Sequence, residues 1–153
     1  MENSSQYCTF YVAGHCFGLD VLRVQEIIRY QEMTRVPLAP REVRGLINLR
    51  GQIVTAIDLR RRLGLSDLAN ELEPVNVVVQ TADGAVSLLV DEFGDVLNVP
   101  ETLFEPPPET LQGTARELIR GACKLEDRLL LVLDADRTAD LSSGRGVEHP
   151  GDA

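Results

Sequence analysis

Two apolar runs separated by a short polar break occupy the stretch Arg44-Gly45-Leu46-Ile47-Asn48-Leu49-Arg50-Gly51-Gln52-Ile53-Val54-Thr55-Ala56-Ile57-Asp58-Leu59. Both runs are rich in aliphatic and β-branched side chains, which suit a buried pleated surface. Gly51 can adopt a positive φ and turn the chain tightly, so we predict a β-hairpin that holds Arg50 at its tip. On residue type alone, Arg50 is either a solvated turn residue or a fixed recognition group, and solvation is the commoner state of arginine.

Composition limits the class of protein. The chain has 153 residues, of which 44% are hydrophobic and 5% aromatic, so aliphatic side chains must fill the interior. This length fits one domain of common size, or two small subdomains that share a core. The formal net charge is −9, which disfavours a nucleic-acid partner because such proteins usually carry a basic footprint. A local basic run, Arg60-Arg61-Arg62, is predicted to be a solvated strand end or turn.

The cysteines and the apolar runs bear on the cellular compartment. Cys8, Cys16 and Cys123 are odd in number and lack Cys-x-x-Cys spacing, so we expect no disulfide framework. The chain opens without a secretory leader, and its apolar runs are shorter than the roughly 18 residues that cross a bilayer. We expect a cytoplasmic protein whose only membrane association runs through a partner.

Short strands separated by turns account for most of the chain. Beyond the central hairpin, the pattern predicts strands over residues 7–12, 16–19, 75–81, 85–90, 95–99, 119–125 and 129–133. The connecting segments are predicted as a helical turn that runs into a strand (21–28), an extended connection (34–40), a helical turn (40–45), a polar loop (66–73), a stiff proline-rich connector (105–109) and a short C-terminal helix (134–141). We expect residues 1–6 and 142–153 to be disordered. So many short strands predict an all-β fold, with two small barrels side by side.

Catalytic side chains are sparse. His15 and His149 are the only histidines, and neither has a cysteine or carboxylate partner at metal-ligand spacing. Cys16 is adjacent to His15, so in a strand the two side chains point to opposite faces. Asp58 and Asp91 follow apolar runs, where strand ends explain them better than acid–base chemistry does. We therefore predict a protein that is not an enzyme, with no metal and no cofactor.

Further motifs surround the central hairpin in a fixed order. The first half carries Phe17-Gly18-Leu19-Asp20, Val24-Gln25-Glu26-Ile27, Thr34-Arg35-Val36-Pro37 and the close of the hairpin at residues 57–60. The second half carries Leu89-Val90-Asp91, Asp95-Val96-Leu97, Ile119-Arg120-Gly121 and an aliphatic-Asp run over residues 129–134. This series, over residues 6–141, resembles the CheW family of chemotaxis coupling proteins. A single Asn-Leu-Arg-Gly motif would be weak, but the ordered series is specific.

The resemblance implies a fold and a role. The fold would be two SH3-like barrels with a groove between them, forming a CheW-like domain over residues 7–141. The role would be that of a non-enzymatic adaptor linking the signalling tip of chemoreceptors (methyl-accepting chemotaxis proteins) to the regulatory domain of the histidine kinase CheA, at receptor arrays. Because that domain resembles CheW, the two would pack pseudo-symmetrically and build rings. The chain shows no kinase, phosphotransfer or receiver segment, so we expect a stand-alone coupling protein.

The resemblance also implies site residues. The receptor-binding positions would be Val24, Glu26, Ile27, Asn48, Arg50, Gly51, Leu89 and Val99. Among them, Glu26 and Arg50 would face each other, and a receptor helix would lie on an apolar surface beside them. From periodicity alone, Val24 and Ile27 could equally be ordinary core. The kinase-binding positions would be Met33, Val36, Leu38, Glu105 and Thr110. Glu105 stands where relatives can carry a basic residue, so an electrostatic contact there would require a different partner surface.

Two alternatives stay open. The first is a CheW-like adaptor of a non-flagellar chemosensory pathway, such as one that controls twitching or a second messenger. The second is a small β-barrel module that binds a ligand such as an oligonucleotide or oligosaccharide. That module would need a basic or aromatic-lined face, which an acidic chain with few aromatic residues is poorly equipped to supply.

Overall fold

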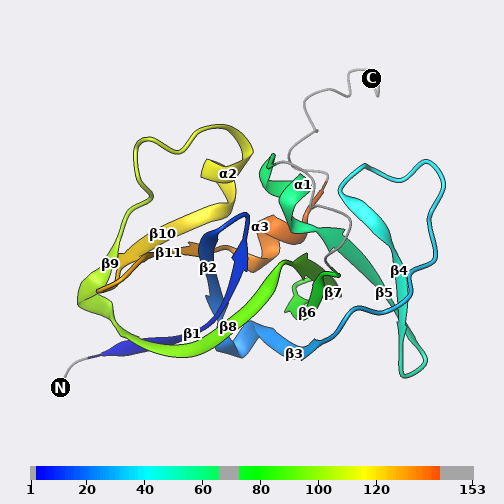
Figure 1. The fold of residues 1–153 in the computed structure, drawn as a ribbon, viewed down its shortest axis with the longest axis horizontal. Helices are drawn as coiled ribbons and strands as arrows, with labels where there is room; N and C mark the ends of the chain where they lie inside the picture. The colour runs from blue at the N-terminus through cyan, green and yellow to red at the C-terminus, as the bar shows by residue number, and fades with distance from the viewer. Residues whose placement is uncertain (1–2, 66–72, 142–153) are drawn as a thin grey trace.

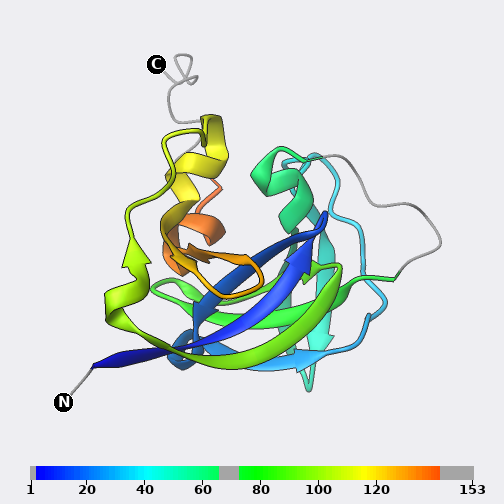
Figure 2. The same ribbon diagram turned by 60° about the vertical axis from the view of Figure 1, so that its left-hand side comes forward.

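The computed structural model describes residues 3–65 and 73–141, so the expectations for residues 1–2, 66–72 and 142–153 lie outside the described residues. The described chain folds into two curved sheets connected by short helical segments (Figures 1 and 2). The predicted all-β architecture of two small barrels is confirmed. The chain starts in the first barrel, crosses to the second for β3 to β7, and returns to the first for β8 to β11.

The first sheet has the order β8-β1-β2-β11-β10-β9. Its strands are β1 (Ser4–Val12), β2 (His15–Asp20), β8 (Glu92–Pro100), β9 (Phe104–Glu105), β10 (Ile119–Lys124) and β11 (Leu129–Leu133). The expectation of disorder over residues 1–6 is wrong for residues 4–6, which belong to β1 and pair with residues 98–100 of β8. These residues are polar, and they are ordered by ladder pairing with a distant strand, which local composition does not reveal.

The second sheet has the order β3-β6-β7-β5-β4. Its strands are β3 (Val24–Ile28), β4 (Val43–Leu49), β5 (Gln52–Asp58), β6 (Val75–Thr81) and β7 (Gly84–Val90). The connection that leaves β3, at one edge, pairs with β4, at the other edge. In this bridge the Thr34 N–H donates to the Leu46 carbonyl at 2.9 Å, and the Leu46 N–H donates to the Thr34 carbonyl at 2.8 Å. The two edges of the sheet are thereby brought together, and the sheet curls into a barrel.

Short helical segments connect the strands: η1 (Val21–Arg23), α1 (Leu59–Leu63), η2 (Glu101–Leu103), α2 (Gly113–Leu118) and α3 (Ala135–Ala139). The predicted helical turn running into a strand is confirmed by η1 and β3, and the predicted C-terminal helix by α3. The helical turn predicted over residues 40–45 is wrong. One turn, in which the Val43 N–H donates to the Pro40 carbonyl at 2.9 Å, leads directly into β4. Helix α2 was not predicted. None of the helices in the described residues has the length and apolar character needed to span a membrane.

The hydrophobic core lies in three clusters. Each barrel has its own cluster, and a larger central cluster is shared by both sheets. Along β6, Val77 and Val79 belong to the central cluster, whereas Val78 belongs to the second barrel. Strand β11 divides its side chains in the same way. Strands buried on both faces explain why these segments read as continuous apolar runs.

The basic run after β5 forms most of helix α1, and the prediction that it is a solvated strand end or turn is wrong. Asp58 caps this helix by accepting the Arg61 N–H at 3.2 Å. Successive residues of a helix point about 100° apart, so three adjacent arginines cannot all face water. Arg62 is only 4% exposed. Its guanidinium donates to the carbonyls of Thr138, Arg137 and Asp140 at 2.9, 2.8 and 3.1 Å, and so holds the end of α3.

We predict that Arg62→Ala lowers the free energy of unfolding by about 2–4 kcal/mol, because it leaves buried carbonyls without donors. Arg62→Lys should recover only part of this loss, since an ammonium lacks the planar fork that reaches three acceptors. Chemical denaturation monitored by circular dichroism measures both effects. The control is Arg35→Ala, at an exposed arginine. Equal destabilisation by Arg62→Ala and Arg35→Ala would contradict a structural role for Arg62.

A second arginine of α1 forms an ion pair between the barrels. Arg60 binds Asp91 with two hydrogen bonds, from Nε at 3.0 Å and from Nη2 at 2.7 Å. Asp91 also accepts the Ala13 N–H, in the turn between β1 and β2, at 2.8 Å. Burial alone would raise the pKa of Asp91, but the hydrogen bonds from Arg60 and Ala13 and the charge of Arg60 outweigh it, so the pKa is lowered. The carboxylate is therefore held in its charged form.

The lowered pKa of Asp91 predicts a component of acid sensitivity. A carboxyl group whose pKa is lower in the folded state stabilises the protein above its unfolded pKa, and this contribution is lost as pH falls through the folded pKa. We expect Asp91→Asn to be less stable than the native protein at neutral pH and to lose less stability below about pH 5. Urea titrations across that range measure the slope. Asp83→Asn, which removes an exposed carboxylate, should retain the native slope, and an unchanged slope in Asp91→Asn would refute the assignment.

Candidate functional site

The tip of the central hairpin is a two-residue turn between β4 and β5. Arg50 and Gly51 have φ angles of +52° and +88°, as a type I′ turn requires, so the predicted hairpin and the positive φ of Gly51 are confirmed. Asn48 stabilises the turn, because its Oδ1 accepts the Gly51 N–H at 2.8 Å. Arg50 is the unusual member, since residues other than glycine seldom adopt a positive φ. The turn therefore fixes the direction in which Arg50 leaves the barrel.

Arg50 forms an ion pair with Glu26. Its Nη2 donates to Oε2 of Glu26, although the two residues are 24 positions apart in the chain. The expectation that these side chains face each other is confirmed. The Arg50 side chain is 70% exposed and that of Glu26 is 22% exposed. The Glu26 carboxylate, through its hydrogen bond and its charge, raises the pKa of Arg50 above its ordinary value.

The pair also joins the two edges of the second sheet. Glu26 lies on edge strand β3, and Arg50 follows β4 at the opposite edge. Exposed ion pairs contribute little to stability, so this pair acts mainly by position. It holds a carboxylate and a largely exposed guanidinium together at the rim of the barrel.

Neighbouring side chains of strand β3 lie on opposite faces of the sheet. Its register with β6 shifts between Val24 and Glu26, so Val24 lies opposite Val79 and Ile27 lies opposite Val77. Val24 and Ile27 are both partly buried and pack against the central cluster. Glu26 takes the other face of the strand. The two aliphatic side chains are thus partly core and partly surface, which combines the two interpretations that the sequence left open.

Two of the expected receptor-binding residues are core side chains. Leu89 is 3% exposed and belongs to the cluster inside the second barrel. Val99 is also 3% exposed, but it belongs to the cluster of the first barrel. The structure therefore does not bring them to a common surface with Arg50. A residue that the sequence analysis missed is Ile53, which pairs with Asn48 beside the turn and is 60% exposed.

The expected kinase-binding residues fall into two groups. Met33, Val36 and Leu38 lie on the connection between β3 and β4, in the second barrel. Leu38 is fully exposed and has a φ of +63°, so the backbone holds an apolar side chain out in water. Glu105, at the end of β9, and Thr110 are exposed on the first barrel. Figure 1 shows β9 and β4 at opposite ends of the molecule, so the two groups form separate surfaces.

The described residues bring together no evident catalytic or metal-binding group. Cys8, Cys16 and Cys123 are buried free thiols in strands of the first sheet. Within residues 3–65 and 73–141, no three His, Cys, Asp or Glu side chains gather as metal ligands would. Asp58, the last residue of β5, caps α1, and Asp91, which follows β7, forms an ion pair with Arg60. The arrangement instead defines a class of small two-barrel β protein with a charged pair at the rim of one barrel and an exposed leucine on the same barrel.

Comparison with known proteins identifies the family. The CheW-like domain family matches residues 6–142, and the chain belongs to this family. Chemotaxis protein CheW of Bacillus subtilis (strain 168) is 33% identical over 147 residues, which cover 96% of this chain and 94% of the relative. Chemotaxis protein CheW of Klebsiella aerogenes is 31% identical over 132 residues, covering 86% and 80%. The resemblance stated from the sequence is thereby confirmed.

A solved structure supports the same conclusion. The crystal structure of scaffolding protein TtCheW from Thermoanaerobacter tengcongensis superimposes with a TM-score of 0.82 at 25% sequence identity. The match covers 91% of this chain and 94% of the other. The two-barrel arrangement is therefore that of the family.

Proposed function

We propose that this protein is a chemotaxis adaptor that couples chemoreceptors to the histidine kinase CheA. The observation that carries the proposal is the CheW-like domain over residues 6–142, with its Glu26–Arg50 pair at the rim of the second barrel. In this role it would work without catalysis, holding its partners in a geometry through which receptor conformation biases kinase activity. It would act in the cytoplasm, at receptor arrays, and reach the membrane only through the receptors.

The receptor-binding surface would be formed by β3 and the hairpin tip. Val24 and Ile27 keep part of their aliphatic surface accessible, and Ile53 adds an exposed side chain beside the turn. A helical hairpin from a receptor tip could lay its apolar face on these residues. The Glu26–Arg50 pair would fix the orientation of that helix, because charged groups at the rim of an interface contribute register more than affinity.

The protein would have two kinase-binding surfaces, one on each barrel. An adaptor that presents different surfaces at opposite ends makes head-to-tail contacts, and such contacts close into rings when the rotation allows. Val36 and Leu38 would contact one copy of the CheA regulatory domain, with Met33 packed behind them. Glu105 and Thr110 would contact another copy. The acidic Glu105 would favour a basic group on that partner.

The receptor-binding surface is tested by reversing its charge. We expect Arg50→Glu to weaken binding to a receptor signalling fragment by about tenfold while the protein stays folded, because it turns an attraction into a repulsion of Glu26. The double variant Glu26→Arg with Arg50→Glu should recover part of the binding, since the pair reforms with reversed polarity. Co-sedimentation with the fragment and CheA measures both.

Lys124→Glu is the matched control, because it reverses one exposed charge in the first barrel. Circular dichroism of all the variants separates loss of binding from loss of fold. Unfolding of Arg50→Glu would show that Arg50 is structural. A control that weakens binding as much as Arg50→Glu would show that only the net charge matters.

The kinase-binding surface is tested at the exposed leucine. We expect Leu38→Asp to weaken binding to the isolated CheA regulatory domain by about tenfold, because it places a charge where an apolar contact is proposed. Leu22→Asp is the control, since Leu22 is 86% exposed on η1 and belongs to neither proposed surface. Isothermal titration calorimetry measures both affinities. If Leu38→Asp binds as tightly as the native protein, this part of the proposal fails.

A further inference from the structure

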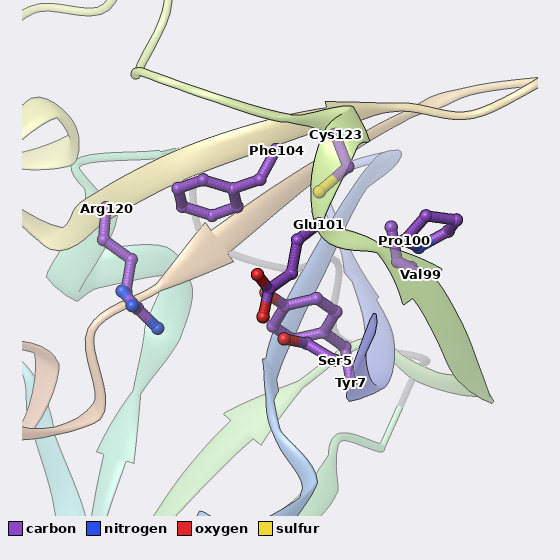
Figure 3. A pocket seen from close by; sticks show the side chains of 8 residues that line it. All are labelled: Ser5, Tyr7, Val99, Pro100, Glu101, Phe104, Arg120 and Cys123. Atoms are coloured by element: carbon purple, nitrogen blue, oxygen red, sulfur yellow. The ribbon is translucent and has the colours of Figure 1, made fainter. Parts of the chain in front are cut away.

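A small pocket lies in the first barrel, at the end of β8 and beside β9 and β10, far from the hairpin tip. Its volume is about 230 Å³. Tyr7, Val99 and Cys123, all buried, form its inner side. Figure 3 shows Arg120 and Phe104 on one side of the pocket, Pro100 on the other, and Glu101 between them. The pocket includes Arg120 of the motif Ile119-Arg120-Gly121, for which receptor and kinase binding gave no reason.

One wall of the pocket is fixed by glycine. A Cβ atom at Gly121 would lie 2.1 Å from Cζ of Phe104, so only a residue without a side chain lets this ring lie against β10. The guanidinium carbon of Arg120 lies 5.8 Å from the centre of the same ring, within the range of a cation–π contact. The Phe104 ring is thus held between Gly121 and Arg120, and this wall is formed before any ligand arrives.

The pocket is lined by one acidic and one basic side chain. Glu101 and Arg120 both line it, and both are exposed. Among the described residues, neither side chain forms a hydrogen bond or an ion pair. Both charges are therefore accessible to a ligand that carries the complementary groups.

The inner side adds a buried hydrogen-bonding group. Tyr7 is only 6% exposed. Burial raises the pKa of its phenol, although a hydrogen bond with Ser5 and the charge of Arg120 oppose the change. The phenol therefore keeps its proton at neutral pH and can donate to a ligand. Pockets that combine apolar walls with a few convergent polar groups are the usual sites of small molecules.

We propose that this pocket binds a small zwitterion of the α-amino acid class with a short aliphatic side chain. Its carboxylate would bind Arg120, its ammonium group would bind Glu101, and its side chain would pack against Phe104 and Val99. The volume holds roughly seven or eight water-sized groups, since a water occupies about 30 Å³. This size suits a small molecule such as an amino acid. The presence of both charges favours a zwitterion over a simple carboxylate or amine.

Titration of the full chain with L-valine tests the proposal, with amide chemical shifts of the isotope-labelled protein as the readout. We expect saturable shifts at residues around the pocket, with a dissociation constant in the millimolar range. Isovalerate and isobutylamine, which keep the carbon skeleton of the side chain and one charge each, should bind at least about tenfold more weakly, because each lacks one of the two charge-assisted hydrogen bonds. Equal binding of either single-charge probe would overturn the assignment of a zwitterion.

Charge-neutral variants locate the site. Arg120→Gln and Glu101→Gln should each weaken L-valine binding by about tenfold, since each removes one charge-assisted hydrogen bond. Lys124→Gln and Glu126→Gln are matched controls that remove the same charges nearby, outside the pocket. All four positions are exposed, so the unfolding midpoints should stay close to the native value. Absence of saturable binding by L-valine at tens of millimolar, or equal weakening by the controls, would refute the proposal.

Discussion

The rest of the structure depends on the central hydrophobic cluster that both barrels share. Strands of the first sheet contribute Phe10 and Phe17, and strands of the second contribute Ile57, Val77 and Leu88. Neither barrel could bury these side chains alone, and removing apolar surface from water is the main favourable term in folding. The two barrels are therefore one folding unit, although the chain between them crosses over twice.

Arginines fix the relative orientation of the two barrels, which apolar packing alone would leave less specific. Arg62 holds the end of α3, and Arg60 binds Asp91 beside the turn between β1 and β2. Arg23, before β3, donates to Asp136 of α3. Each of these hydrogen bonds connects parts of the chain that are far apart in the sequence. Directional hydrogen bonds of this kind select one arrangement of the two barrels. Apolar contacts, which have no preferred direction, would allow several.

Local sequence patterns predicted most strands, because alternation and turn residues act over a few positions. The hairpin at Arg50 and Gly51 and the helical turn before β3 are of this kind. The pattern failed where distant contacts decide the structure. Residues 4–6 are ordered by β8, and the buried Arg62 is bound by carbonyls at the end of α3. Neither a polar N-terminus nor a run of three arginines carries a local sign of such a partner.

The same difference between local and distant contacts decides which features of the candidate site could be predicted. The facing of Glu26 and Arg50 could be predicted only through resemblance to a family, since the two residues belong to opposite edges of a sheet. Exposure could not be predicted at all from residue type: Leu89 is buried, whereas Leu38 is fully exposed at a positive φ. Exposing a leucine in a left-handed conformation costs free energy, and such strain persists only where the surrounding structure fixes it. The connection between β3 and β4 is fixed by the bridge at Thr34, which also brings the edges of the second sheet together. The same backbone contacts that close the barrel therefore also hold the connection from which Leu38, proposed to contact the kinase, extends.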